Sequence, residues 1–431
     1  MNPAVSDSAN ALRELARAHL WHPYTPASAV DEGLPVIVAG EGPWLVDADG
    51  RRWLDAIASW WACALGHGHP AVVEAIRRQA AELDHCILGG LIHPRAAELA
   101  ARLACRMPEP RVHVHFASDG ASAVEAAVKI ALQFHVNRGV TERTELLALE
   151  NAYHGDTLAA VGLGFLEGFH APFRPVVRPA VRLPVPYGGR DLDRCVAAAR
   201  DAFASRRGRV AAVVVEPLCQ GAAGMRMYPA GYLAALSDLA RHEGALLIVD
   251  EIATGFGRTG RWFAFEHADV TPDIVCLGKA LSGGTLPISA AVVRDEVYAT
   301  FAAPPPDRTF HHGHTFAGNP IAAAAALAAL DVYEAEDLPG RAERMGVAMK
   351  ERLAALHGAG GVADVRCLGL IGAVEFDGPA RVRAVRDRLW ARRILARPLG
   401  PVVYLMPPLN IAPDLLDHAC SALVEAVRAA G

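Results

Sequence analysis

The chain has 431 residues, enough for two domains, and 52% of them are hydrophobic, which excludes an intrinsically disordered protein. Its 42 basic and 47 acidic side chains give a net charge of −5. This balance excludes the basic surface that binding to nucleic acid or to an anionic membrane requires, so neither partner is expected.

Nothing in the sequence predicts export or a membrane span. No stretch of 18 or more uninterrupted apolar residues occurs. The first twenty residues, MNPAVSDSANALRELARAHL, lack the basic start and apolar core of a secretory signal. The eight cysteines are scattered and form no C-x-x-C pair. We therefore expect most of the thiols to be buried and the protein to be cytoplasmic.

The predicted elements begin with a short amphipathic helix in the first twenty residues, followed by the loop WHPYTP. Two short strands are predicted at 35–39 and 44–47, with Asp49-Gly50 as the turn before Trp53. From about residue 70 helical and strand-like segments alternate, which predicts a mainly parallel, buried sheet. The predicted helices are 70–83, 94–105 and 122–136, and the predicted strands are 112–116, 146–149, 211–215, 246–249 and 274–277.

The C-terminal part follows a segment rich in proline and histidine at 301–314. Helices are predicted at 320–336, 340–357, 379–392 and 414–429, and strands at 370–376 and 402–406. We expect an α/β protein with a large domain at 66–325, which holds the main sheet. A smaller α+β domain is predicted from both termini, 1–65 and 326–431.

One lysine has unusual surroundings. Of the 42 basic residues only three are lysines, namely Lys129, Lys279 and Lys350. Lys279 lies in LGKALSGG (277–284), directly after a predicted buried strand, where loss of solvent lowers the pKa of an amine. Lys129 follows Glu125 by four residues on a predicted helix, which predicts a surface ion pair.

Carboxylates also follow predicted strands. Asp250 and Glu251 end one strand and Glu216 ends another, and ligands of open α/β sheets bind beyond the carboxyl ends of strands. Asp250 with Lys279 can be a catalytic pair or a structural ion pair at the sheet edge. Glu216 can pair with an arginine near a pocket or cap its strand.

The turn ASDGAS (117–122) joins a predicted strand to a predicted helix. A helix N-terminus favours phosphate, although residues such as Ser118 and Asp119 more commonly serve as an N-cap. A phosphate site, a strand-end carboxylate and a strand-end lysine together meet the needs of pyridoxal phosphate. Lysine can form the Schiff base, which arginine cannot, and the carboxylate keeps the pyridine nitrogen protonated.

Two longer motifs resemble a known family. VDEIATGFGRTG (249–260) and CLGKALSGG (276–284) are similar to the signature of the class III pyridoxal-phosphate aminotransferases. The resemblance extends from WHPYT (21–25) to YLMPP (404–408). It implies fold type I of the pyridoxal-phosphate transferases, pyridoxal 5'-phosphate as cofactor, and a homodimer with active sites at the subunit interface.

The resemblance also implies roles for single residues. Lys279 is expected to be the Schiff-base lysine and proton shuttle, Asp250 to pair with the pyridinium nitrogen, and Tyr153 to stack on the cofactor ring. The other expected cofactor-binding residues are Gly120, Ala121, Ser122, Ile252 and, from the second subunit, Thr315. The expected substrate-binding residues are Tyr24, Trp60, Trp61, Tyr153, Gly313 and Arg397.

Five further segments are similar to the branch of the family that serves biotin biosynthesis: SWWA (59–62), NAYHGDT (151–157), EPLCQGAAGMRMY (216–228), HGHTFAGNP (312–320) and ARPLGPVVYLMPP (396–408). This similarity implies conversion of 8-amino-7-oxononanoate to 7,8-diaminononanoate, by a ping-pong reaction through pyridoxamine phosphate. S-adenosylmethionine is the donor it implies. Four alternatives stay open: a broader ω-amino-acid or ornithine-type aminotransferase, the same reaction with a donor such as lysine, an aminomutase, and a non-enzymatic metal- or ligand-binding protein.

Several positions differ from the family pattern. Ala121 replaces the usual serine after the phosphate-loop glycine, Ala152 replaces a glycine, and His314 replaces a proline. His314 leaves the identity of the amino donor open. The histidine pairs, such as His67 with His69, lack a neighbouring acidic ligand, so no metal site is predicted.

Overall fold

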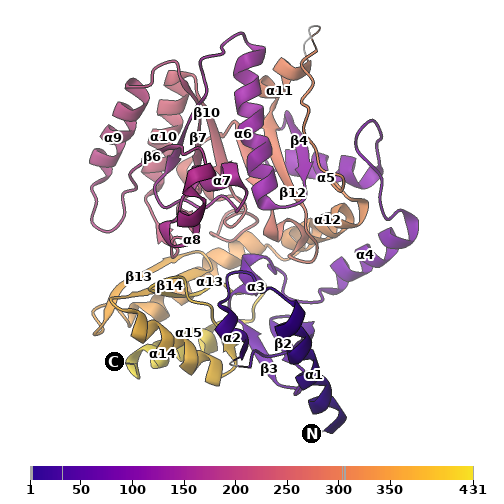
Figure 1. Ribbon diagram of the computed structural model, residues 1–431, viewed down its shortest axis with the longest axis vertical. Coiled ribbons are helices and arrows are strands. Elements are labelled where there is room, and N and C mark those ends of the chain that lie inside the picture. Colours follow the sequence, from indigo (N-terminus) through magenta and orange to yellow (C-terminus); the bar gives the residue numbers. More distant parts are fainter. Residues whose placement is uncertain (1–2, 32, 303, 305–306, 431) are drawn as a thin grey trace.

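The structure, a computed structural model, describes residues 3–31, 33–302, 304 and 307–430 (Figure 1). The other positions of the predicted small domain (1, 2, 32 and 431) and of the segment rich in proline and histidine (303, 305 and 306) lie outside the described residues.

A seven-stranded sheet forms the centre of the larger part of the molecule, with the strand order β4-β12-β11-β10-β7-β5-β6. β12 runs antiparallel to both of its neighbours, and the other pairs are parallel, so the prediction of a mainly parallel sheet is confirmed. The strands are β4 Val112–Ala117, β5 Glu145–Leu149, β6 Val181–Leu183, β7 Val210–Val215, β10 Leu246–Asp250, β11 Ile274–Leu277 and β12 Ser289–Arg294.

Helices cover both faces of this sheet, and this explains why its strands are apolar at successive positions. Val213 and Val215 belong to the core on one face, while Val214 between them belongs to the core beside α6 (Gly120–Asn137) on the other. Because side chains alternate along a strand, both sets are buried only when both faces are covered. Every residue of β7, β10 and β11 is buried.

The remaining helices of this part lie before, between and after these strands along the chain. They are α4 Pro70–Glu82, α5 Pro94–Ala104, α7 Leu158–Leu163, α8 Glu167–His170, α9 Leu192–Ala204, α10 Ala230–Glu243, α11 Asp295–Ala302 and α12 Pro320–Ala335. Short 3-10 helices lie at Ala171–Val176, Ala264–Ala268 and Lys279–Ser282, and β8 (Cys219–Gln220) pairs with β9 (Arg226–Met227).

Elements from both ends of the chain lie together beside this larger part, as the indigo and yellow ribbons of Figure 1 show. One sheet has the order β1-β2-β3-β15 and another the order β13-β14-β16. The strands are β1 Ile37–Glu41, β2 Trp44–Asp47, β3 Arg52–Asp55, β13 Val362–Leu368, β14 Ile371–Phe376, β15 Ile394–Leu395 and β16 Val402–Leu405. The helices are α1 Pro3–His19, α2 Ala27–Asp31, α3 Ala58–Trp61, α13 Leu338–Ala354, α14 Pro379–Ala391 and α15 Pro413–Arg428.

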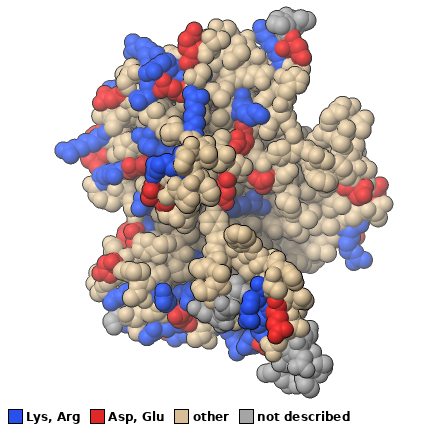
Figure 2. Space-filling model, viewed as in Figure 1, with Lys and Arg blue, Asp and Glu red and all other residues tan. Residues whose placement is uncertain are grey.

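One strand pair joins the N-terminal and C-terminal segments directly. β15 lies parallel to β3, with Ile394 opposite Leu54. The predicted division into 66–325 and 1–65 with 326–431 remains a proposal, and its boundary at 325 falls inside α12. Figure 2 shows basic and acidic side chains interspersed over the face in view. Among the described residues, no helix has both the length and the apolar composition needed to cross a membrane.

Candidate active site

A cavity of about 520 Å³ lies beyond the carboxyl ends of β4, β7, β10 and β11. Each of these strands supplies lining residues from the turn that follows it, and the loops around Trp61 and Tyr153 close the sides. The four residues that follow these strands or end them are Gly120, Glu216, Asp250 and Lys279. The structure therefore brings together the strand-end groups that the sequence singled out.

Lys279 enters the cavity from the turn after β11. Its φ of 42° lies in the left-handed region, which a residue with a side chain seldom occupies and which the neighbouring structure must hold. Burial lowers the pKa of its amine, against the opposing charges of Asp250 and Glu216. The Nζ atom lies 5.3 Å from the ring centre of Trp61. A lowered pKa raises the neutral, nucleophilic fraction of this amine.

Asp250 ends β10 and is buried. Its Oδ2 lies 2.7 Å from Nδ1 of His154, and its Oδ1 accepts a hydrogen bond from the Ile252 backbone N–H at 3.1 Å. An ionised carboxylate only accepts, so the histidine Nδ1 carries the proton in this pair. Sequence reasoning missed His154 as a site residue, although it follows Tyr153 in the motif NAYHGDT.

Glu216, whose role the sequence left open, binds backbone and not an arginine. Its Oε2 accepts from the Tyr153 N–H at 2.9 Å and its Oε1 from the Gly221 N–H at 3.0 Å. Burial raises the pKa of this carboxyl to about 7, against the effects of His154 and of the two N–H groups. Glu216 therefore ties together two loops that line or flank the cavity.

The N-terminus of α6 forms the other end of the cavity. Asp119 is its N-cap: Oδ1 accepts from the Ser122 backbone N–H at 2.9 Å, and Oδ2 from the Ser122 hydroxyl at 2.8 Å. The Ser122 hydroxyl thus binds Asp119, and Ser122 is not among the lining residues. Gly120 and Ala121 do line the cavity, where the first N–H groups of a helix have no partner within the helix.

Tight packing leaves no room for side chains at this end. A Cβ atom on Gly120 would lie 2.8 Å from Cδ1 of Ile252, and one on Gly155 would collide with Ala121. Glycine at these two positions lets the backbone approach closely and keeps the space beside Ile252 open.

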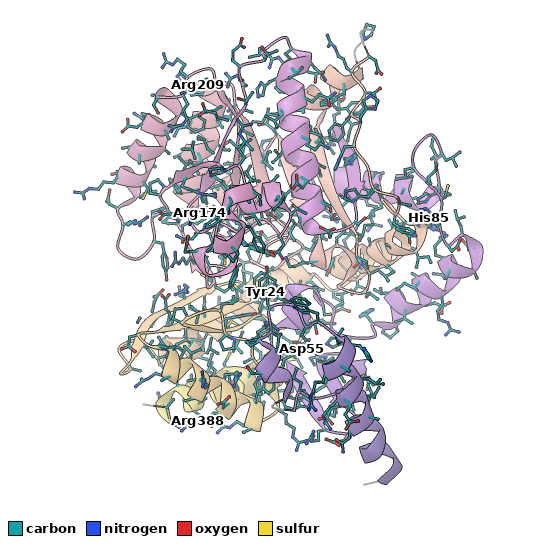
Figure 3. All side chains as sticks on the ribbon, viewed as in Figure 1. Tyr24, Asp55, His85, Arg174, Arg209 and Arg388 are labelled. Atoms are coloured by element: carbon teal, nitrogen blue, oxygen red, sulfur yellow. The ribbon has the colours of Figure 1, made fainter. Side chains whose placement is uncertain are left out.

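Aromatic side chains and an arginine stand together beside the cavity. Tyr24 and Trp60 meet edge to face at 5.5 Å between ring centres, and the guanidinium carbon of Arg397 lies 4.4 Å from the ring centre of Trp60. Arg397 also donates to the Tyr24 carbonyl at 2.9 Å. The Trp61 Nε1–H donates to the Tyr404 hydroxyl at 3.0 Å. Figure 3 shows Tyr24 at the junction of the two parts of the molecule.

Tyr24 and Tyr153 keep their protons. Burial and the hydrogen bond from Tyr24 to Asp156 raise the pKa of Tyr24 to about 12. Burial likewise raises the pKa of Tyr153, whose ring stacks near His170 with 6.1 Å between ring centres. Asp156 is a further cavity residue that sequence reasoning did not single out.

Like Ser122, Tyr24, Trp60 and Arg397, two further predicted residues do not line the cavity. Gly313 and Thr315 are exposed and are not among its lining residues. In the same segment, His312 Nδ1 lies 3.0 Å from Nζ of Lys129. The partner that the sequence predicted for Lys129, Glu125, instead accepts a hydrogen bond from the Thr157 hydroxyl at 2.6 Å.

The other motif residues have packing roles. Arg258 is buried, and its guanidinium donates to the carbonyls of Pro407 at 2.6 Å and Leu370 at 3.3 Å. Within the described part of the chain, no three His, Cys, Asp or Glu side chains converge to hold a metal ion.

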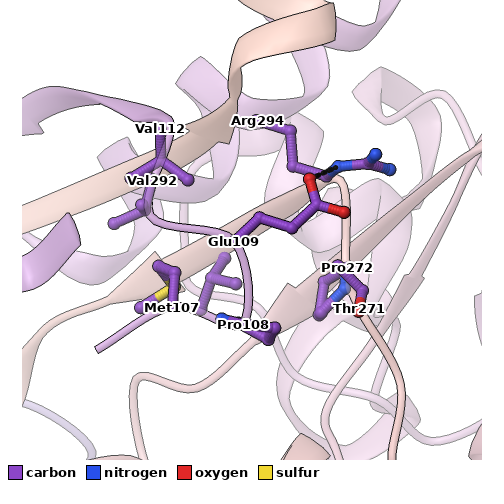
Figure 4. A pocket seen from close by; sticks show the side chains of 9 residues that line it. Met107, Pro108, Glu109, Val112, Thr271, Pro272, Val292 and Arg294 are labelled. Atoms are coloured by element: carbon purple, nitrogen blue, oxygen red, sulfur yellow. Dashed lines mark hydrogen bonds and ion pairs between the residues drawn. The ribbon is translucent and has the colours of Figure 1, made fainter. Parts of the chain in front are cut away.

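A second recess, of about 10 Å³, lies at the opposite end of the sheet, between the start of β4 and the end of β12 (Figure 4). It is lined by Val112 and Arg294 among others, and has room for about one water molecule. A substrate does not fit there, so the chemistry belongs to the large cavity.

The residues of the large cavity fit pyridoxal phosphate. Lys279 and Asp250 supply the amine and the buried carboxylate, and the cradle at Gly120, which a Cβ atom would fill, supplies free N–H groups for a phosphate. Ile252 and Tyr153 both line the space between these groups.

Known proteins have similar sequences. The sequence model of the class III aminotransferases matches residues 27–427. An adenosylmethionine-8-amino-7-oxononanoate aminotransferase of Geobacter sulfurreducens is 39% identical, covering 97% of this chain and 97% of its own length.

Solved structures agree with these matches. The structure of the enzyme with that name from Methanocaldococcus jannaschii has a TM-score of 0.92 and 33% identity, covering 97% of this chain and 99% of its own. A PLP-bound amine transaminase from an uncultivated Pseudomonas species has a TM-score of 0.91 and 32% identity, covering 96% and 99%. With a family match over residues 27–427 and relatives of this similarity, the chain belongs to the class III aminotransferases.

Proposed function

We propose that this chain transfers an amino group to 8-amino-7-oxononanoate, forming 7,8-diaminononanoate in biotin biosynthesis, with S-adenosylmethionine as the donor. The names of its relatives support this activity. One observation of the structure carries the proposal: Lys279 and Asp250 line one cavity, and Trp60, Tyr24 and Arg397 stand together beside it.

Amino transfer requires one group that can both accept a proton and donate it. Pyridoxal phosphate, when bound, supplies an aldehyde that accepts an amine and a ring that withdraws electrons. Burial favours the neutral form of the Lys279 amine, and the neutral Nζ atom can take up a proton and return it. Contacts with His154 and with the Ile252 backbone N–H fix the orientation of the Asp250 carboxyl group at the cavity.

The wall beside the cavity suits a long aliphatic substrate with a carboxylate. Trp60 and Trp61 offer apolar surface, and the planar guanidinium of Arg397 can bind both oxygens of a carboxylate. Because Arg397 already lies against Trp60 and Tyr24, a carboxylate bound to it would lie next to these rings.

The proposal includes a homodimer. Several large apolar side chains are exposed near the segment that carries Gly313 and Thr315, among them Ile92 at 89%, Phe316 at 61%, Leu91 at 55% and Ile87 at 51%. Patches of this kind mark protein interfaces, and a second copy would cover this one. We infer that Thr315 and Gly313 serve the cavity of the other subunit. All eight cysteines are free, which fits a reducing cytoplasm.

His314 stands where the family pattern has a proline, and this difference leaves the identity of the amino donor open. Several donors are therefore compared. The purified holoenzyme is mixed in single-turnover experiments with S-adenosylmethionine, lysine, ornithine or alanine, and the cofactor spectrum is followed. We expect a rapid change with S-adenosylmethionine alone, followed by recovery on addition of 8-amino-7-oxononanoate. Lys279→Ala is the control, and should bind cofactor without turnover. A response to lysine or ornithine and not to S-adenosylmethionine would refute the proposed donor.

A further inference from the structure

The two tryptophans beside the cavity lie in an unusual backbone turn. Four successive residues, Ala58 to Trp61, have φ values of 46°, 44°, 70° and 73°, and none of them is glycine. The left-handed conformation is unfavourable for an L-residue, so a run of four needs support from its surroundings.

A buried carboxylate supplies that support. Asp55, the last residue of β3, has 0% exposure. One of its oxygens, Oδ2, accepts from the Ser59 hydroxyl at 2.7 Å and lies 2.9 Å from Nε2 of His67. The other, Oδ1, accepts from the Ile57 N–H at 3.3 Å. Figure 3 places Asp55 below Tyr24, on the side of the terminal elements.

The bond between Asp55 and His67 has the character of an ion pair. Burial lowers the pKa of His67, but hydrogen bonds to Asp55 and Cys63 outweigh burial and raise it to about 9. An imidazolium therefore faces the carboxylate at neutral pH, and the carboxylate remains charged to hold Ser59.

The turn is also confined on two sides. A Cβ atom on Gly284, in the loop after Lys279, would collide with the Ala62 carbonyl. One on Gly221 would lie 3.0 Å from the Trp61 ring. Trp61 belongs to this turn and its ring centre lies 5.3 Å from Nζ of Lys279, so a change in the turn moves Trp61 relative to Lys279.

We propose that Asp55 is a positioning residue for substrate binding, which acts through Ser59 and His67 on the left-handed turn at Ala58–Trp61. By holding this turn it places Trp61 against Lys279 and Trp60 against Arg397. The identity of the substrate rests on the proposed function. The geometry of the turn does not.

The test compares Ser59→Ala with Ser59→Gly in the holoenzyme. Both changes remove the hydroxyl that binds Asp55, but only glycine adopts positive φ without strain. We expect Ser59→Ala to raise the KM for the keto acceptor by about tenfold, as loss of a hydrogen bond to a charged group predicts, with kcat within about twofold. Ser59→Gly should restore KM to within about twofold of the parent. The near-UV circular dichroism of the tryptophans should change in the alanine variant and return in the glycine variant.

Two results would overturn the proposal. One is equal KM values and equal near-UV spectra for Ser59→Ala and the parent. The other is equal impairment of Ser59→Ala and Ser59→Gly, which would mean that the hydroxyl acts on the substrate site by a route other than the left-handed turn. Asp55→Asn is a second variant, expected to resemble Ser59→Ala. If the parent does not convert 8-amino-7-oxononanoate, the proposed function fails, while the near-UV comparison still decides the role of Asp55 and Ser59.

Discussion

Nδ1 of His154 lies 2.7 Å from Oδ2 of Asp250, and both side chains are buried. The imidazole N–H stabilises a carboxylate that has lost most of its contact with water. Its other nitrogen, Nε2, is buried without a hydrogen-bond partner in the structure. Among the described residues, the one hydrogen bond of the His154 ring is therefore with the residue that the sequence assigned to the cofactor.

We predict that His154→Phe weakens cofactor binding. The change keeps a ring in place but removes the donor to Asp250, and a hydrogen bond to a charged group contributes about 1.5–3 kcal/mol. The dissociation constant of pyridoxal phosphate, measured by equilibrium titration of the apoenzyme, should rise about tenfold or more. His135→Phe is the control, because His135 is also buried but binds the Ala211 carbonyl away from the cavity. Unchanged affinity in His154→Phe would contradict this role.

Glu216 is expected to support two loops at once. In Glu216→Ala the N–H groups of Tyr153 and Gly221 lose their acceptors, at a cost of about 1–3 kcal/mol for each buried group. The melting temperature and kcat/KM should both fall. Glu216→Gln, whose single carbonyl oxygen can keep one acceptor, should fall between this variant and the parent. Equal stability of all three proteins would show that the loops do not depend on Glu216.

The pair of His67 and Asp55 predicts a specific dependence of stability on pH. The pKa of His67 is raised from 6.5 to about 9. The pair therefore stabilises the folded state fully below pH 6.5, and this stabilisation is lost as the pH rises through 9. With about 1.4 kcal/mol for each pKa unit, the effect is on the order of 3 kcal/mol.

Urea unfolding of the parent and of His67→Gln at several pH values measures this effect. The difference in unfolding free energy should be largest near pH 6 and should shrink between pH 7 and 10. Cys63→Ala is the control for the thiol that also faces the ring. A difference that is constant with pH would contradict the raised pKa.

Gly284 is predicted to tolerate no side chain. Its φ is +85°, and a Cβ atom there would collide with the Ala62 carbonyl. Gly358 has a similar φ of +74° but no atom within 4 Å of the added Cβ. Gly358→Ala should therefore cost about 1–2 kcal/mol for the backbone alone. Gly284→Ala should cost about 1–3 kcal/mol more because of the collision, and should lower activity as well. Equal melting temperatures would disprove the packing argument.

The local pattern of apolar residues predicts much of the fold. The short apolar runs at 246–249 and 274–277 predict strands, and the structure has them at Leu246–Asp250 and Ile274–Leu277. These predictions are confirmed because a strand covered on both faces must be apolar at successive positions. The carboxyl ends of such strands form the binding edge of an open sheet, which is why Asp250 and Lys279 were expected to meet there.

Other elements have weak local signals. β12 (Ser289–Arg294) runs antiparallel within a parallel sheet, and the direction of a strand depends on its partners and not on its own residues. β15 has two residues and pairs with β3, which lies near the other end of the chain. Neither pairing can be predicted from the residues of the strand itself.

The sequence by itself determined the family of this protein and predicted its chemistry, because the motifs around Asp250 and Lys279 can be recognised from the chain alone. Only the tertiary structure decided how these groups are held. The bond from His154 to Asp250 depends on which loop covers the cavity. The left-handed turn of Trp60 and Trp61 contains no glycine, so no residue in it predicted a positive φ. The turn is stabilised by Asp55 and by the loops packed against it, contacts that form only when the chain has folded.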